Sequence, residues 1–214
     1  MRLILVRHGE TQANVEKRYL GHSDSPLTDK GWEQAHHVAK SLLDLGLAAA
    51  VQEDSSQGQS NEDHRVRLYT SDLGRCLATA NIIGKLIGLE PIIEPDLREL
   101  NFGEWDGMTY EDIMSNNRSL AERWYEDPFT IAPPGGETVA EMGVRLDHWL
   151  NCRFITDTEV DEITTIIVVT HGGPIRWFHS KHVLGDESRF WQSDTVPAGQ
   201  YVIIENERYP YKRT

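Results

Sequence analysis

The sequence has few cysteines and no long hydrophobic run. Two cysteines among 214 residues, Cys76 and Cys152, do not support a disulfide framework, and both lie in helical patterns, so we expect reduced thiols. No apolar run approaches the roughly 20 residues of a membrane-spanning helix. The first apolar run, Leu3–Val6, is too short for the core of a signal peptide and is followed at once by Arg7, so we expect a cytoplasmic chain with no membrane partner.

Positive charge is also scarce. The chain has 21 Lys and Arg against 34 Asp and Glu, which gives a formal net charge of −13. This balance disfavours a broad surface for nucleic acid or for an anionic membrane. Any anion that the protein binds must therefore be held in a local cationic pocket. The composition, 39% hydrophobic and 26% charged, is that of an ordinary globular protein whose length suits one domain.

The spacings that metal sites use are missing as well. Nine histidines are present, but there is no His-Glu-x-x-His motif and no cysteine cluster. His36 and His37 are adjacent, so their side chains diverge on a helix. His179 and His182 could share one helix face, but no carboxylate stands at a matching spacing. We therefore predict no metal and no cofactor.

The most informative feature present is a pair of apolar runs that each end in histidine and glycine. Leu3–Val6 stops at Arg7-His8-Gly9, and Ile163–Thr170 stops at His171-Gly172-Gly173. Both runs are apolar enough to be buried strands. Ligands of open α/β sheets bind beyond the carboxyl ends of the strands, where these turns place an arginine and two imidazoles. One such turn alone is equally well explained as an ordinary connection, but the repeat favours a site.

Hydrophobic periods divide the rest of the chain. They predict helices from Thr28 to about Gly46, from Leu73 to Ile87 and from Pro174 onward, and one or two short helices between Thr109 and Trp124. A further helix is predicted after a capping box formed by Thr138 and Glu141. The predicted strands are 66–70, 91–93 and 201–205. We expect loops at 11–26 and 97–107 and a polar tail at 209–214. Residues 52–65 contain no apolar side chain, so we predict a mobile solvated loop there.

A segment at about 105–137 is rich in aromatic rings and has the pattern of a lid-like helical insertion. Its rings are Trp105, Tyr110, Trp124, Tyr125 and Phe129. Core packing explains such rings as well as a substrate lid does. We expect packing for most of them.

Four motif blocks carry a resemblance to a known family. LVRHGETQAN (5–14), SDLGRCLATA (71–80), LRELNFGEWDG (97–107) and VVTHGG (168–173) resemble, in order and spacing, the blocks of the histidine phosphatase superfamily, the phosphoglycerate mutase-like group. The resemblance covers nearly the whole chain. It implies a three-layer α/β/α sandwich in which a mostly parallel sheet has an antiparallel edge strand, formed by a single domain over residues 1–214.

The resemblance also implies roles for individual residues. His8 is the expected nucleophile, Arg7, Arg75 and His171 are expected to hold the phosphoryl group, and Glu99, which matches the family block better than Glu104, is expected to protonate the leaving group. The expected substrate contacts are Thr11, Asn14, Gly21, His22 and Gly172. From its helix position alone, Arg75 could equally be a surface salt-bridge residue.

Physical chemistry agrees with these roles. Hydrolysis of a phosphate monoester requires an enzyme to remove a barrier of about 20 kcal/mol or more. A covalent phosphohistidine divides the reaction into two easier displacements. His8 must then be neutral, and Arg7, Arg75 and a charged His171 would lower its pKa. The same cations attract the phosphoryl oxygens.

We therefore predict a phosphatase for small phosphorylated metabolites. α-Ribazole 5′-phosphate is one candidate substrate, because blocks 102–107 and 124–136 are similar to those of α-ribazole phosphatases. The same blocks are similar to those of broad-specificity phosphatases, and they do not decide between the two. A cofactor-dependent phosphoglycerate mutase is the alternative of the same chemistry, although the stretch after Glu99 lacks the Arg-His-Tyr-Gly-type sequence and the long basic insertion of such mutases. A non-catalytic phosphate-binding module is the alternative from another class. The expected partner is a small phosphate ester, and a homodimer is left open.

Overall fold

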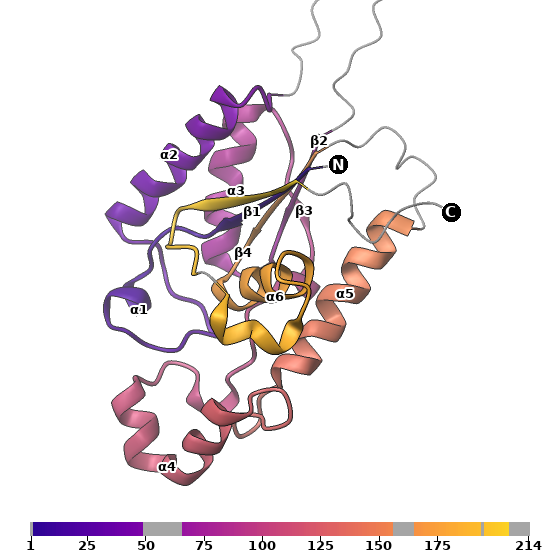
Figure 1. Cartoon of the computed structure of the whole chain (residues 1–214). Helices are drawn as coiled ribbons and strands as arrows, with labels where there is room; N and C mark the ends of the chain where they lie inside the picture. The colour runs from indigo at the N-terminus through magenta and orange to yellow at the C-terminus, as the bar shows by residue number, and fades with distance from the viewer. Residues whose placement is uncertain (1, 49–65, 156–164, 194, 206–214) are drawn as a thin grey trace, which may run out of the picture.

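A five-stranded sheet forms the centre of the computed structural model, which describes residues 2–48, 66–155, 165–193 and 195–205 (Figure 1). The strand order is β3-β2-β4-β1-β5. The bounds are β1 Arg2–Arg7, β2 Val66–Thr70, β3 Ile92–Ile93, β4 Thr165–Thr170 and β5 Tyr201–Glu205. Strand β5 pairs antiparallel with β1, and the other pairs are parallel. The predicted sheet with its antiparallel edge strand is confirmed.

Helices cover both faces of this sheet (Figure 1). The helices of the described residues are α1 (Gln12–Val15), α2 (Asp29–Asp44), α3 (Gly74–Ile87), α4 (Tyr110–Glu126), α5 (Val139–Ile155) and α6 (Gly172–His182). Of these, α2 and α3 lie against one face of the sheet, and α5 and α6 lie against the other. Side chains of β1 alternate between the faces, so Ile4 and Val6 pack with α2 and α3, whereas Leu3 and Leu5 pack with α5 and α6. The predicted three-layer α/β/α sandwich is confirmed.

Local sequence explains where several helices begin and end. Thr28 Oγ1 accepts a hydrogen bond from Gly31 N at 3.0 Å and starts α2. The predicted capping box before α5 forms, with Thr138 N 2.7 Å from Glu141 Oε2. Gly88 ends α3 with a φ of 76°, which favours glycine. Helix α4 contains one non-helical residue, Asn117, in agreement with one or two short helices.

Some segments differ from the expectation or lie outside the described residues. The predicted loop at 11–26 contains the short helix α1, because Thr11 and Asn14 form a capping box. The 97–107 segment begins at the last residue of the 3-10 turn Pro95–Leu97 and contains a second 3-10 turn, Gly103–Trp105. Residues 163–164, the predicted 52–65 loop and the predicted tail lie outside the described residues.

The aromatic segment lies at one end of the molecule, around α4 (Figure 1). Trp105 and Trp124 are each 1% exposed, which confirms packing for these two rings, whereas Tyr110 is exposed. Cys76 and Cys152 lie on α3 and α5, so their predicted helical placement is confirmed. Within the described ranges, no helix has both the length and the apolar character needed to span a membrane.

Candidate active site

The register of β1 against β4 places two imidazoles side by side. Arg7 pairs with Thr170 in the ladder, so His8 and His171 are the first residues beyond it. The ring centroids of His8 and His171 are 5.2 Å apart, and the rings meet edge to face. His8 is 4% exposed and His171 is fully buried. The structure thus brings the two glycine-flanked histidines to one sheet edge.

The His8 ring has a defined protonation state. Its Nδ1 lies 2.8 Å from the carbonyl oxygen of Gly9, and because a carbonyl only accepts, Nδ1 carries the hydrogen. The pKa of His8 is lowered from 6.5 to about 3, mainly by burial and further by the charges of Arg75 and Arg7. His8 is therefore neutral near pH 7, with its lone pair on Nε2.

Arg75 is buried against His171 rather than exposed on the helix surface. Its Nε donates to His171 Nδ1 at 3.2 Å, and His171 Nε2 lies 3.0 Å from Ser71 Oγ. Burial and the charge of Arg75 hold the pKa of His171 well below its usual value. The expectation of a charged His171 is therefore wrong, because a proton on Nδ1 would face the guanidinium.

The loop before α2 surrounds the Arg75 guanidinium. Arg75 Nη2 donates to Gly21 O at 2.7 Å, and Arg75 Nη1 donates to Ser23 O at 2.8 Å. A side chain at Gly21 would clash with the main chain, since a Cβ would lie 2.6 Å from Leu100 O. Gly21 therefore holds Arg75 through its carbonyl and lets two loops approach closely.

Glu99 lies at the start of α6. Its Oε1 accepts hydrogen bonds from Gly173 N at 3.0 Å and Leu100 N at 2.9 Å. A Cβ built at Gly172 would lie 3.6 Å from Arg7 Cζ and 3.7 Å from Glu99 Oε2. The Arg7 guanidinium and the Glu99 carboxylate thus flank one space above Gly172. Glu104, the weaker candidate, is exposed.

The main chain around Glu99 is held by side chains from other elements. His22 Nε2 lies 3.0 Å from Glu99 O, and Arg145 Nη2 donates to the same oxygen at 2.8 Å. Arg145 Nη1 also donates to Asp96 O and Arg98 O, and its Nη2 lies 2.7 Å from Glu137 Oε1. Sequence reasoning missed Arg145, since an arginine inside an amphipathic helix gives no local sign of the loop that it binds.

Thr11 and Asn14 support α1. Thr11 N donates to Asn14 Oδ1 at 3.0 Å, and Asn14 N donates to Thr11 Oγ1 at 3.2 Å. Thr11 is fully buried. These bonds fix the chain directly after the His8 turn, and they occupy the side-chain oxygens of both residues.

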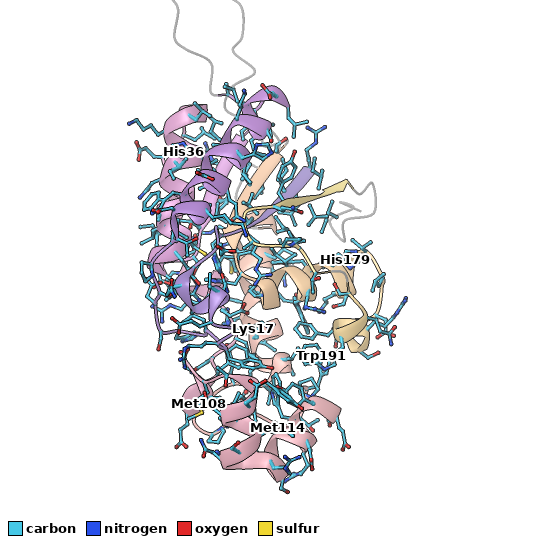
Figure 2. The ribbon with its side chains drawn as sticks, turned by 90° about the vertical axis from the view of Figure 1, so that its left-hand side faces the viewer. Lys17, His36, Met108, Met114, His179 and Trp191 are labelled. Carbon is cyan, nitrogen blue, oxygen red and sulfur yellow. The ribbon has the colours of Figure 1, made fainter. Side chains whose placement is uncertain are left out.

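A cavity of about 290 Å³ opens beside Arg7 and Glu99. Its aromatic wall consists of Tyr19, Phe102, Trp124, Phe190 and Trp191. Figure 2 shows Trp191 above the segment that carries α4, where its ring meets that of Trp124 at 5.7 Å. Arg176 of α6 adds a second cation. Sequence reasoning did not single out Arg176 or Trp191.

Arg7 faces this cavity with an unused donor. Its Nη1 donates to Val196 O at 2.9 Å, whereas its buried Nε has no hydrogen-bond partner among the described residues. Burial lowers the pKa of Arg7 below its usual value, and the charge of Glu99 opposes that shift. An arginine remains charged under such conditions, so the site has an anion-binding group ready.

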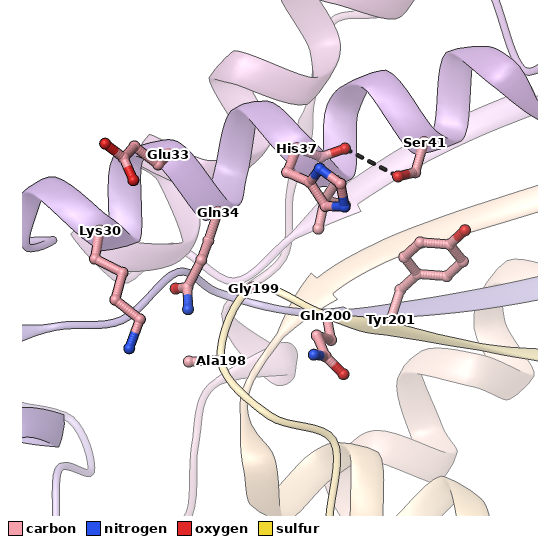
Figure 3. Close-up of a pocket in the computed structure, with 10 residues that line it drawn as sticks. Lys30, Glu33, Gln34, His37, Ser41, Ala198, Gly199, Gln200 and Tyr201 are labelled. Atoms are coloured by element: carbon pink, nitrogen blue, oxygen red, sulfur yellow. Dashed lines mark hydrogen bonds between the residues drawn. The ribbon is translucent and has the colours of Figure 1, made fainter.

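A larger cavity, of about 660 Å³, lies between α2 and residues 198–201 (Figure 3). It is lined by side chains such as Lys30, Gln34 and His37, and by no residue of the predicted site. Gly199, in its wall, reaches the site only through its backbone N, which donates to His8 O at 2.9 Å. We therefore assign the candidate site to the smaller cavity.

Within the part of the chain that the structure describes, metal-binding side chains form no cluster at either cavity. Among the residues that the structure describes, no three His, Cys, Asp or Glu side chains are arranged to hold a metal ion. His179, half of the helical pair considered from sequence, lies 2.9 Å from Ser193 Oγ. Independence from metals and cofactors stays a prediction.

Buried cations beside neutral imidazoles, at the carboxyl edge of a mostly parallel sheet, form a candidate anion site in an α/β protein. The family model of the histidine phosphatase superfamily (branch 1) matches residues 3–211. The chain belongs to this superfamily, as the motif blocks predicted.

Individual relatives differ in their names. Phosphoserine phosphatase 1 of Hydrogenobacter thermophilus is 30% identical over 97% of this chain and 88% of that protein. The probable phosphoglycerate mutase GpmB of Photorhabdus laumondii is 35% identical over 72% of this chain and 63% of its own length. The crystal structure of the α-ribazole phosphatase from Shigella flexneri has a TM-score of 0.76 and 28% identity, covering 97% of this chain and 92% of that one. The chain spans 42% of the length of three mycobacterial relatives that are 31% identical.

Proposed function

We propose that this chain is a phosphatase that hydrolyses phosphate monoesters of small metabolites through a phosphohistidine at His8. The observation that carries the proposal is the state of the His8 ring. Its Nδ1 is bound to Gly9 O at 2.8 Å and its pKa is about 3, so Nε2 stays unprotonated. A neutral imidazole of one tautomer beside Arg7 and Arg75 suits attack on a phosphoryl group.

In the first step, the lone pair of His8 Nε2 forms a bond to phosphorus while the ester P–O bond breaks. Arg7, with its unpartnered Nε, binds the phosphoryl oxygens, and the charge of Arg75 stabilises them. Glu99, across the space above Gly172, gives its proton to the departing alcohol oxygen. The product is phosphohistidine and a neutral alcohol.

In the second step, water attacks phosphorus and the P–N bond breaks. Glu99 accepts a proton from this water, so the carboxyl group returns to its starting state. Inorganic phosphate leaves, and Nε2 of His8 regains its lone pair. His171 Nδ1 accepts a hydrogen bond from Arg75, and His171 Nε2 lies beside Ser71 Oγ. For the His171 ring to contact the phosphoryl group directly, one of these two partners must be replaced by the substrate.

Trapping the intermediate tests this proposal. Purified protein is mixed with a ³²P-labelled ester, quenched within milliseconds without acid, and mapped by peptide. We expect label on His8, none in His8→Ala, and normal labelling in the control His36→Ala, whose side chain is exposed on α2. Label on another residue, or undiminished turnover by His8→Ala, contradicts the proposal. A wild type without turnover favours the non-catalytic module instead.

The substrate is the finer part of the proposal. The names of the relatives support a panel of α-ribazole 5′-phosphate, O-phosphoserine and 3-phosphoglycerate. The mutase alternative is supported by the GpmB relatives. An assay of 3-phosphoglycerate with a bisphosphoglycerate primer distinguishes a mutase from a phosphatase. Isomerisation of 3-phosphoglycerate faster than phosphate release favours the mutase.

The lid-like role of residues 105–137 is supported by Trp124, which lies in the cavity wall. A homodimer stays a prediction, which light scattering tests.

A further inference from the structure

The cavity beside Glu99 contains positive charge that the protein does not pair. Among the described residues, no carboxylate lies within ion-pair distance of Arg7 or Arg176, although the chain has a net charge of −13. Several other buried or partly buried cations have such partners. The pairs are Arg75–Asp24, Arg98–Asp72, Arg145–Glu137 and Lys181–Asp147.

Arg176 is held at one end only. Its Nη1 donates to Phe190 O at 3.3 Å and Ser193 O at 3.0 Å, and its Cζ lies 5.8 Å from the centroid of the Trp191 ring. No described group accepts a hydrogen bond from its Nε or Nη2. Burial and the charge of Arg7 lower the pKa of Arg176, while Glu99 raises it, so the three charges act on one another. The guanidinium is thus oriented and keeps free donors.

Arg7 and Glu99 also define which part of an ester reaches Arg176. Both flank the space above Gly172, where the phosphoryl group and the ester oxygen would lie. The remaining cavity must then receive the alcohol portion. The whole cavity, at about 290 Å³, lies at the small end of ligand pockets, so this portion must be short.

We infer that Arg176 binds a second anionic group, on the alcohol portion of the substrate, so that esters with a carboxylate or a second phosphate are preferred. This inference rests on the proposed function for its position in the cavity. An oriented guanidinium forms charge-assisted hydrogen bonds with either anion, often two at once. An uncharged alcohol portion would leave the Nε and Nη2 donors of Arg176 without an acceptor among the described residues, in a half-buried position.

Binding of phosphonates tests this without any turnover, because their P–C bond is not hydrolysed. 2-Carboxyethylphosphonate and propylphosphonate have the same chain length and differ in the carboxylate, and 1,3-propanediylbisphosphonate supplies a second phosphonate. By calorimetry at one fixed salt concentration, we expect at least one of the two doubly anionic probes to bind about tenfold more tightly than propylphosphonate. The tighter of the two identifies the second anion.

Variants distinguish a direct contact between Arg176 and the second anionic group from a purely structural role of Arg176. Arg176→Gln should abolish the preference, and Arg176→Lys should retain part of it because the charge remains. The control Arg189→Gln removes an equal charge from the neighbouring 187–192 turn, where Arg189 is exposed and bonded to Gln192, and should leave the preference intact. A purely structural role of Arg176 would instead weaken all three phosphonates equally.

The inference and the proposed function can fail separately. The inference about Arg176 is overturned if the wild type binds propylphosphonate as tightly as both doubly anionic probes, or binds none of the three phosphonates. It is also overturned if the Arg176→Gln variant shows the same preference as the wild type. Phosphatase activity together with equal phosphonate affinities leaves the proposed function standing alone. A clear preference without hydrolysis of any ester supports the role of Arg176 and contradicts the phosphatase.

Discussion

The inner and outer halves of the candidate site are built in different ways. The inner half consists of His8, Arg75 and His171, which are at most 4% exposed and hydrogen-bonded to one another or to backbone. The outer half is a cavity walled by loops, α4 and α6, where Trp191 is 46% exposed and Arg176 keeps free donors. The sheet edge thus preorganises the proposed chemistry, whereas the proposed contacts with the rest of the substrate come from segments outside the sheet.

Removal of His8 is the strongest test of the inner half. We expect His8→Ala to lower kcat by about 10⁴-fold or more, because the covalent route is lost. Steady-state hydrolysis of p-nitrophenyl phosphate measures this. His36→Ala, on the exposed face of α2 (Figure 2), is the control and should match the wild type. A loss of less than tenfold in His8→Ala would remove the basis of the comparison.

Arg145 joins the two halves, because it holds the loop that carries Glu99. Arg145→Met removes the guanidinium donor to three carbonyls and its ion pair with Glu137, and we expect the free energy of unfolding to fall by about 3 kcal/mol. Urea denaturation measures this. The control Arg118→Met breaks an exposed pair with Glu122 and should cost less than about 1 kcal/mol. Equal losses in the two variants would show that the clamp contributes nothing special.

Two adjacent glycines test the boundary between the halves. A Cβ at Gly173 would lie 2.2 Å from Glu99 Oε1, so Gly173→Ala must displace the proposed proton donor, and we expect kcat to fall about 100-fold. At Gly172 a Cβ meets only ordinary contacts, at 3.6 Å and beyond. Gly172→Ala should therefore keep Glu99 in place and reduce kcat less. Kinetics on both variants measure this, and an unchanged kcat in Gly173→Ala would argue against Glu99.

The low pKa of His8 makes a smaller, pH-dependent difference. Between 6.5 and about 3, the unfolded chain binds a proton at His8 that the folded protein does not bind, so stability falls as the pH falls through this window. The expected slope is about 1.4 kcal/mol per pH unit. His171 contributes with the same sign.

Urea denaturation at pH 7.5, 6.0 and 5.0 measures that slope. Carboxylates also titrate at the acid end, so the comparison is with His8→Asn, in which the His8 contribution is absent. We expect the variant to lose stability less steeply below pH 6.5. Parallel pH profiles would mean that His8 is accessible to protons in the folded protein.

Motifs in the sequence predicted the inner half because its geometry follows from strand ends. Two buried parallel strands that each end in histidine must bring these histidines to one edge, and the ladder pairs Arg7 with Thr170. Helical period alone left Arg75 open between the surface and the site. The charge of His171 was predicted wrongly, because it depends on a 3.2 Å contact with Arg75 that no spacing contains.

The sequence by itself determined the layers of the fold, the antiparallel edge strand and the family, because hydrophobic period and motif order are local properties of the chain. Only the tertiary structure decided that Arg145 holds the Glu99 loop and that Arg176 and Trp191 line the cavity. An arginine on an amphipathic helix has the same local pattern whether it faces water or a pocket. Which one it faces depends on the packing of segments that are distant in the chain.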